Sequence, residues 1–201
     1  MLTTVFGNIA ESSPAQAVPF HLATRFAAAP PAAPAAAQAL LQEAVASIGL
    51  PAARARVGLQ LAATLLGQGR PAEALPHYQT VIAAGVPELG DFARLGAASC
   101  LQALGREQEA VAAYRQLADS SATATEPAAE ATLRWGLLLL RDPAKRPEAE
   151  AVFTQLLDRH PATTAATSAS FYLGYLEFAR GDYAAAERRL AELLKQQNLP
   201  V

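Results

Sequence analysis

Apolar positions recur with helical spacing over most of this 201-residue chain. Residues 34–49 are an example, with apolar side chains three or four residues apart, which places them on one face of a helix. These positions are Ala37, Leu40, Leu41, Ala44, Val45 and Ile48. The chain has no run of alternating β-branched or aromatic residues bounded by turns, which is the pattern typical of strands. The sequence therefore predicts an all-α protein.

Beyond residue 51 the helical pattern repeats four times. Each repeat has a small residue in a first helix, a turn, a second small residue and, four positions later, a bulky one. The first small residues are Ala62, Ala98, Gly136 and Gly174, spaced by 36, 38 and 38 residues, and the turns contain Gly69, Gly105, Asp142-Pro143 and Gly181. The second small residues are Ala74, Ala110, Ala149 and Ala186, and the bulky ones are Tyr78, Tyr114, Phe153 and Leu190. Small residues allow two helices to approach closely, and pairs that cannot bury their own apolar faces must stack.

These residues resemble the tetratricopeptide repeat family, with about four repeats over residues 52–197. The best match is LGYLEFARGDYAAAERRLAELL, which has the family's leucine-glycine, glycine-aspartate-tyrosine and alanine positions. The resemblance implies a right-handed superhelical stack of antiparallel helix pairs. Two departures are a spacing longer than the usual period of about 34 residues and Pro76, which is expected to kink a second helix or to shift its start.

The chain divides into three parts by composition. Residues 1–33 form an arm rich in alanine and proline, residues 34–50 an extra or capping helix, and residues 51–201 the four helix pairs. Phe6, Phe20 and Phe26 lie in the arm. One interpretation is a semi-rigid linker with incidental apolar residues. The other is an arm that docks on its own array or on a second copy, because solvated tails usually lack aromatic residues.

A candidate binding surface follows from the resemblance. In this family the first helix of each pair lines a concave groove that holds peptides. By register, the groove residues here are Leu59, Phe92, Leu95, Ser99, Gln102, Leu133, Leu137, Phe171, Tyr175 and Phe178. The family's carboxylate-clamping members use lysine and asparagine at such positions, and these are absent, so an apolar extended segment or an amphipathic helix is the expected ligand. The alternative for the leucines is packing against adjacent first helices.

The C-terminal end of the array is a second candidate surface. The segment KQQNLPV after the fourth pair leaves no room for an extra polar capping helix. Because an uncapped repeat end is a liability unless something covers it, Leu190, Leu193 and Leu194 are expected to meet a partner or another copy.

Charge and chemical motifs exclude several classes of function. The net charge is −2 and Lys145 and Lys195 are the only lysines, so we expect no nucleic-acid partner. No apolar stretch approaches the roughly 18 residues of a membrane span, so we expect no direct membrane insertion. There is no phosphate-binding loop, nucleophile elbow or histidine cluster at metal spacing. We therefore expect no enzyme activity, cofactor, metal or small-molecule substrate.

Single residues outside these patterns have structural interpretations. Cys100 and Trp135 are expected in the core. His77 is expected on a helix surface, and His160 at a helix end where it can favourably face the helix dipole.

The sequence therefore predicts a non-catalytic scaffold for another protein or a second copy of itself. One alternative is a structural subunit that assembles into an oligomer or filament through its arm. Another is an accessory protein of a bacterial envelope or secretion complex, because HPATTAATSASFYLGYLEFARGDY resembles periplasmic tetratricopeptide proteins. The N-terminus lacks a basic region and an apolar core, so it does not resemble an export signal and a cytoplasmic location is expected. A periplasmic or extracellular location is the alternative if such a signal was removed or is not recognised.

Overall fold

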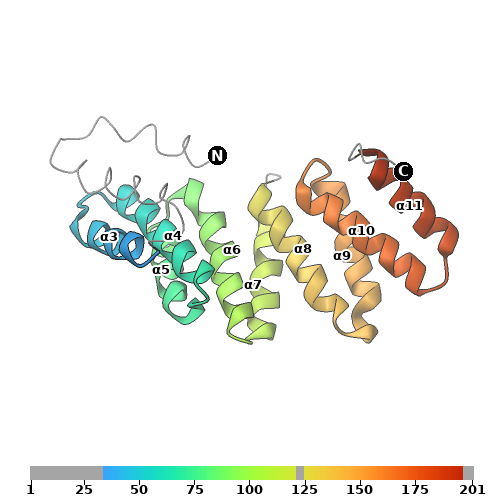
Figure 1. The fold of residues 1–201 in the computed structure, drawn as a ribbon, viewed down its shortest axis with the longest axis horizontal. Helices are drawn as coiled ribbons and strands as arrows, with labels where there is room; N and C mark the ends of the chain where they lie inside the picture. Colours follow the sequence, from blue (N-terminus) through green and yellow to red (C-terminus); the bar gives the residue numbers. More distant parts are fainter. Residues whose placement is uncertain (1–33, 121–124, 197–201) are drawn as a thin grey trace. The chain divides into compact units, whose positions relative to one another are not determined.

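The computed structural model describes residues 34–120 and 125–196, and in these ranges the regular structure is helical (Figure 1). The α-helices are α3 (Pro34–Ser47), α4 (Pro51–Gly67), α5 (Pro71–Ala83), α6 (Pro87–Ala103), α7 (Glu107–Ser120), α8 (Glu126–Leu140), α9 (Arg146–Arg159), α10 (Thr164–Ala179) and α11 (Tyr183–Gln196). A short 3₁₀ helix, η1 (Pro143–Lys145), precedes α9. The predicted all-α fold is confirmed. The arm with Phe6, Phe20 and Phe26 lies outside the described residues.

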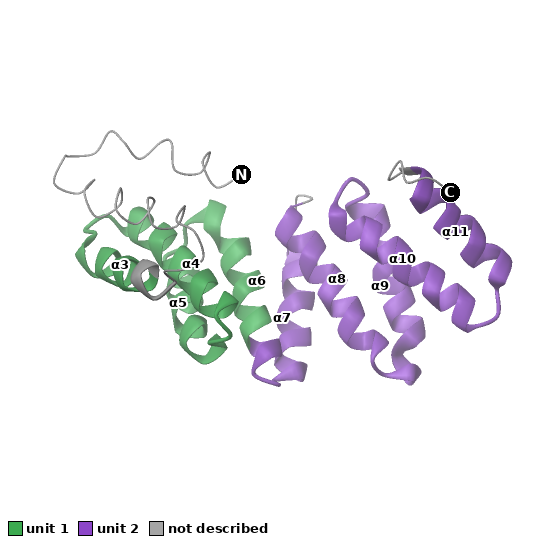
Figure 2. Ribbon diagram, in the orientation of Figure 1, with its two compact units in different colours: residues 1–100 green, residues 101–201 purple. Residues whose placement is uncertain are grey.

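The chain forms two compact units, residues 1–100 and residues 101–201 (Figure 2). Unit 1 holds α3, α4, α5 and most of α6. Unit 2 holds the last residues of α6 and all of α7 to α11. Each unit has its own buried apolar side chains, and each is described by itself below.

Unit 1 is built on α4, which packs against α3 on one side and α5 on the other. Its core includes Leu41 of α3, Leu61 of α4 and Tyr78 of α5. A Cβ at Gly96 of α6 would collide with the ring of Tyr78, so only glycine permits this close approach. Cys100 is buried, as predicted, and burial raises the pKa of its thiol to about 11, which keeps it protonated and unreactive.

Unit 2 repeats the same kind of packing. α8 packs against α7 and α9, and α10 packs against α8, α9 and α11. The buried ring of Phe153 occupies the space that a Cβ at Gly136 would need, and Leu190 lies against Gly174 in the last pair. The predicted pairing of a small residue on the first helix with a bulky residue on the second is therefore present in both pairs of unit 2. In unit 1 the residue that meets Tyr78 is Gly96, which is not one of the predicted small residues. Trp135 is buried, as expected, and Arg115 lies 5.6 Å from the centre of its ring.

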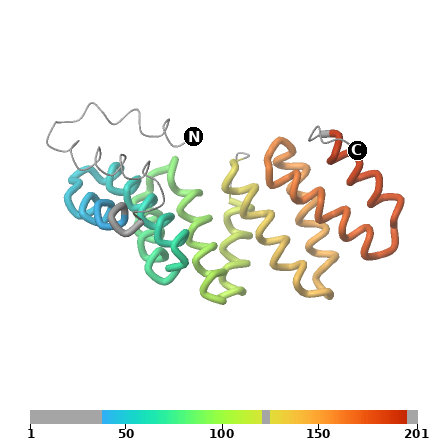
Figure 3. The backbone as a smooth tube through the Cα atoms, in the orientation of Figure 1, coloured from blue at the N-terminus to red at the C-terminus, as the bar shows by residue number. Residues whose placement is uncertain are grey.

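Short turns join the two helices of each pair, as the backbone trace shows for α10 and α11 (Figure 3). Gly181 has a φ of 88°, and the amide after it, that of Asp182, donates to the carbonyl of Glu177 at 2.9 Å. This is the left-handed cap that favours glycine. The α8–α9 turn instead uses Asp142, whose side chain accepts a hydrogen bond from the amide of Ala144 at 3.0 Å.

Pro76 lies inside α5 without shifting the start of that helix, which begins at Pro71. Of the two expected effects of Pro76, a kink or a shifted start, the shifted start does not occur. Pro71 is tolerated at the first helical position because its missing N–H would have no partner there.

Candidate protein-binding surface

Helix α10 presents three aromatic side chains on its solvent side. Phe171, Tyr175 and Phe178 are 54%, 46% and 59% exposed, and their spacing of four and three residues places them along one side of the helix. We call these three residues the aromatic face of α10. Tyr183, at the start of α11, continues it, because its ring lies edge-on to that of Phe178 with centroids 5.3 Å apart.

The other sides of α10 fix the aromatic face in position. Leu173 and Leu176 are buried, and Tyr172 stacks on Phe153 of α9 with ring centroids 5.7 Å apart. Phe171 in turn meets Tyr172 edge-on at 5.5 Å. The start of α10 is capped by Thr163, whose hydroxyl accepts from the amide of Ala166 at 3.2 Å. The exposed rings therefore sit on a helix that is anchored by packing and by its cap.

A cleft of about 400 Å³ opens beside Phe171. Its walls come from both helices of the last pair, and they are mainly apolar, with three residues that carry a hydroxyl group. The lining residues are Thr167, Ser168, Phe171 and Tyr172 of α10 and Leu190, Leu193 and Leu194 of α11. The three leucines that the sequence assigned to a partner or another copy therefore line this cleft.

The remaining groove residues predicted in unit 2 are less accessible. Leu133 is only 8% exposed and belongs to the core, and Leu137 is half-buried. Gln102 is half-buried and accepts a hydrogen bond from the hydroxyl of Tyr114 at 2.9 Å. In this unit, α10 supplies most of the exposed apolar surface among the predicted groove residues.

In unit 1 the predicted groove residues also divide into exposed and packed ones. Phe92 is exposed, whereas Leu59 and Leu95 are half-buried. The hydroxyl of Ser99 donates to the carbonyl of Leu95 at 2.9 Å, within its own helix. The half-buried leucines agree with the alternative that they serve packing.

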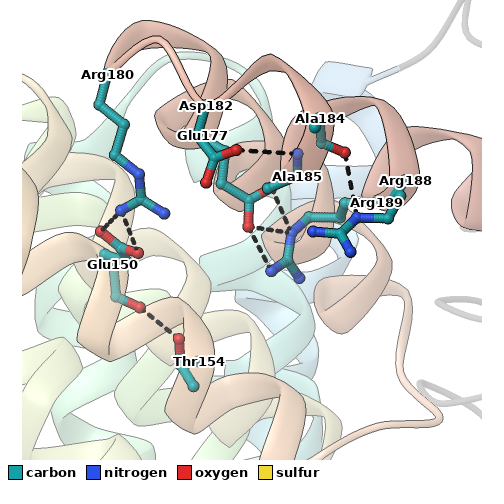
Figure 4. Close-up of polar contacts among 9 residues, drawn as sticks. All are labelled: Glu150, Thr154, Glu177, Arg180, Asp182, Ala184, Ala185, Arg188 and Arg189. Atoms are coloured by element: carbon teal, nitrogen blue, oxygen red, sulfur yellow. Dashed lines mark hydrogen bonds and ion pairs between the residues drawn. The ribbon is translucent and has the colours of Figure 1, made fainter.

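Two arginine–glutamate ion pairs link α10 and the residue after it to α9 and α11 (Figure 4). Arg180, the residue after α10, binds Glu150 of α9 at 2.8 Å on the surface. Arg189 of α11 binds Glu177 of α10 at 2.7 Å, and the side chain of Glu177 is only 9% exposed. Sequence reasoning missed the second pair. The signal was present, because Glu177 occupies the register position of Leu65 and Leu139 in earlier pairs.

His160 follows α9, as expected for a residue at a helix end. It is buried, at 3% exposure, and neither ring nitrogen has a hydrogen-bond partner. Burial lowers the pKa of this imidazole, the neighbouring charge of Arg159 lowers it further, and Glu126 opposes the shift. The neutral form of the ring is therefore favoured.

Across residues 34–120 and 125–196, none of the helices has the length and apolar character that a membrane span requires. In the same residues, no group of three or more histidine, cysteine, aspartate or glutamate side chains is placed to hold a metal ion.

The paired helices and their small-to-bulky contacts agree with a direct sequence match. A family model described as Tetratricopeptide repeat matches residues 59–127 and 133–200, which together make up more than half of the chain. The chain belongs to the tetratricopeptide repeat family. The family's fold generally mediates protein–protein interaction or scaffolding, and its members are generally non-catalytic.

Solved structures show the same fold at low sequence identity. A tetratricopeptide repeat protein from Parabacteroides merdae is 19% identical with a TM-score of 0.69, over 92% of this chain and 68% of that one. MamA from Desulfovibrio magneticus RS-1 is 13% identical with a TM-score of 0.67, over 92% and 97%. Kinesin light chain-like repeats from Podosopora anserina are 18% identical with a TM-score of 0.65, over 93% and 97%. No curated protein sequence matches the chain.

Proposed function

We propose that this tetratricopeptide repeat protein is a scaffold whose aromatic face of α10 binds an apolar segment of another protein. The observation that supports this proposal is the exposure of Phe171, Tyr175 and Phe178 side by side on one anchored helix. Aromatic side chains bury a large area with few rotatable bonds, and they are enriched among the residues that dominate binding energy.

The cleft beside Phe171 indicates the size and chemistry of the side chains that the ligand inserts there. Its volume of about 400 Å³ accommodates one or two bulky apolar side chains. Leu190 and Leu194 offer apolar contact from the α11 side, and the hydroxyls of Thr167 and Ser168 offer hydrogen bonds at the α10 side. An extended apolar peptide or the apolar side of an amphipathic helix has the required chemistry. Leu137 of α8 is a secondary contact in this proposal.

The first test compares partner recovery by the full-length chain and by a Tyr175→Ala, Phe178→Asp variant. Proteins retained from the source cells are identified by mass spectrometry, and the leading candidate is purified and titrated directly. Removing an aromatic anchor typically costs 2 kcal/mol or more of binding free energy, about a thirty-fold weaker affinity. We expect the variant to lose the partner.

The matched control is Leu104→Asp, which places a charge at another exposed apolar position of unit 2. This variant should bind as the unaltered chain does. Equal affinity of the purified partner for all three proteins would exclude the aromatic face as the binding site. A second copy of the chain as the only ligand recovered would favour self-assembly through residues 1–33, which deletion of those residues then tests by light scattering.

A further inference from the structure

At two equivalent positions, the α8/α9 pair of unit 2 has apolar residues and the α10/α11 pair has charged ones. Three residues after the small residue of the first helix comes Leu139 in α8 but Glu177 in α10. Three residues after the small residue of the second helix comes Val152 in α9 but Arg189 in α11. Leu139 and Val152 are buried, at 4% and 3% exposure. An apolar pair in one repeat is therefore a charged pair in the next.

Glu177 and Arg189 bind each other closely. Nη2 of Arg189 donates to Oε1 of Glu177 at 2.7 Å, and Nε donates to Oε2 at 3.0 Å (Figure 4). The guanidinium therefore binds the carboxylate in a bidentate manner. The side chain of Arg189 remains 31% exposed. Next to the pair lies a cleft of about 360 Å³ with both polar and apolar walls. Its other lining residues are Ser170, Arg188 and Glu192, which are polar or charged, and Ala185 and Leu193, which are apolar.

The surroundings of the two pairs explain the difference. Helix α10 contacts both α8 and α9, and thus covers one side of that pair. Among the described residues, α11 contacts α10 alone, and unit 2 has no helix that covers the α10/α11 pair in the same way (Figure 1). Leu139 and Val152 are therefore buried in a helix pair that another helix covers. Glu177 and Arg189 belong to a pair that no described helix covers in this way.

Stacking an apolar helix on Glu177 and Arg189 would remove water from both charges. The loss of hydration of a buried ion pair can exceed the attraction between its charges. Charges at an exposed helix surface disfavour unwanted association. We propose that the Glu177–Arg189 pair prevents a further helix pair, including that of a second copy, from stacking on this side of unit 2.

The test uses a Glu177→Leu, Arg189→Val double variant of the full-length chain. These substitutions give the α10/α11 pair the residues that the α8/α9 pair has at the equivalent positions. Its mass is measured by light scattering and sedimentation over a hundred-fold range of concentration, beside the unaltered chain. We expect the mass of the variant to rise with concentration by about two-fold relative to the unaltered species, because a self-complementary apolar patch forms a closed dimer.

The control is Glu150→Leu, Arg180→Val, which removes an ion pair of the same composition between α9 and the residue after α10. It should leave the mass profile unchanged, and the Tyr175→Ala, Phe178→Asp variant should do the same, which separates this proposal from the binding function. A folded E177L/R189V variant with the mass profile of the unaltered chain would overturn the proposal. So would a decrease in mass, because the ion pair would then belong to a contact between copies.

If circular dichroism shows that the double variant does not fold, Glu177→Leu alone replaces it. The partly exposed Arg189 side chain can then turn towards water. The same rise in mass is expected, and its absence in the folded single variant counts against the proposal in the same way.

Discussion

The α8/α9 and α10/α11 pairs of unit 2 share one repeat pattern but have opposite environments. The first pair is covered by α7 and α10, buries Leu139, Val152 and Phe153, and leaves little apolar surface to solvent. The second exposes Phe171, Tyr175 and Phe178 on one side and holds an ion pair on another. The repeat pattern therefore determines how the two helices of a pair pack against each other. The contacts on the outer sides of the pair depend on which helices lie next to it.

The largest expected effect is a loss of unfolding free energy when a charge is placed in the α8/α9 pair, which α7 and α10 cover. Leu139→Glu buries a carboxylate that has no arginine opposite it, since the equivalent of Arg189 is Val152. An unpaired buried charge costs roughly 3–5 kcal/mol of unfolding free energy. Urea denaturation followed by circular dichroism measures it. A loss below about 1 kcal/mol would show that Leu139 can reach water, and the contrast between the pairs would then fail.

The next largest expected effect is a difference in stability between alanine variants of two mid-helix glycines, Gly136 and Gly174. In Gly136→Ala the new Cβ collides with the buried ring of Phe153, and we expect a loss of about 1–3 kcal/mol from overpacking. In Gly174→Ala the nearest atom is Cδ2 of Leu190, 3.2 Å away on a side chain that can rotate. Because alanine gains up to about 1 kcal/mol of helix propensity over glycine, this variant should be neutral or slightly stabilised. Thermal melting of both proteins decides whether the two contacts differ.

A smaller effect concerns the ion pairs. Arg189→Ala leaves the nearly buried carboxylate of Glu177 without its partner and should cost about 1–2 kcal/mol, allowing for the partial exposure of Arg189. Arg180→Ala breaks an exposed pair, and it should cost less because water already screens those charges. Equal losses in the two variants, measured by denaturant unfolding, would indicate that Glu177 is as accessible to water as Glu150.

The smallest effect is a pH dependence that originates in the covered pair. His160 has a folded-state pKa below its ordinary value, so the unfolded chain binds a proton more readily than the folded chain. Its contribution to stability is complete above the unfolded pKa of about 6.5 and is lost as the pH falls from there towards the folded value. His160→Phe should flatten the fall in melting temperature over this window. An unchanged pH profile would show that protonating His160 carries no cost.

Much of the fold could be predicted from the sequence, because the spacing of small, bulky and turn residues reports local geometry. Gly136 with Phe153 and Gly181 after α10 are examples. Exposure was harder to predict. Leu133 and Phe171 share a register position, yet one is buried and the other exposed, because exposure depends on which helices lie alongside. Glu177 was missed because a glutamate in an amphipathic helix is usually solvated, and its partner Arg189 is twelve residues away on another helix.

Within residues 34–120 and 125–196, α11 packs against α10 alone, and this links binding to local unfolding. Segments with few neighbours open at lower free energy than the rest of a domain, so the backbone amides of α11 should exchange with deuterium earlier than those of α8. Leu190, Leu193 and Leu194 form one wall of the cleft, which therefore exists only while α11 is docked. A ligand held there shifts the opening equilibrium towards the docked form and slows that exchange. The rate of deuterium uptake in α11 therefore reports whether a ligand occupies the cleft, and it requires no label on the ligand.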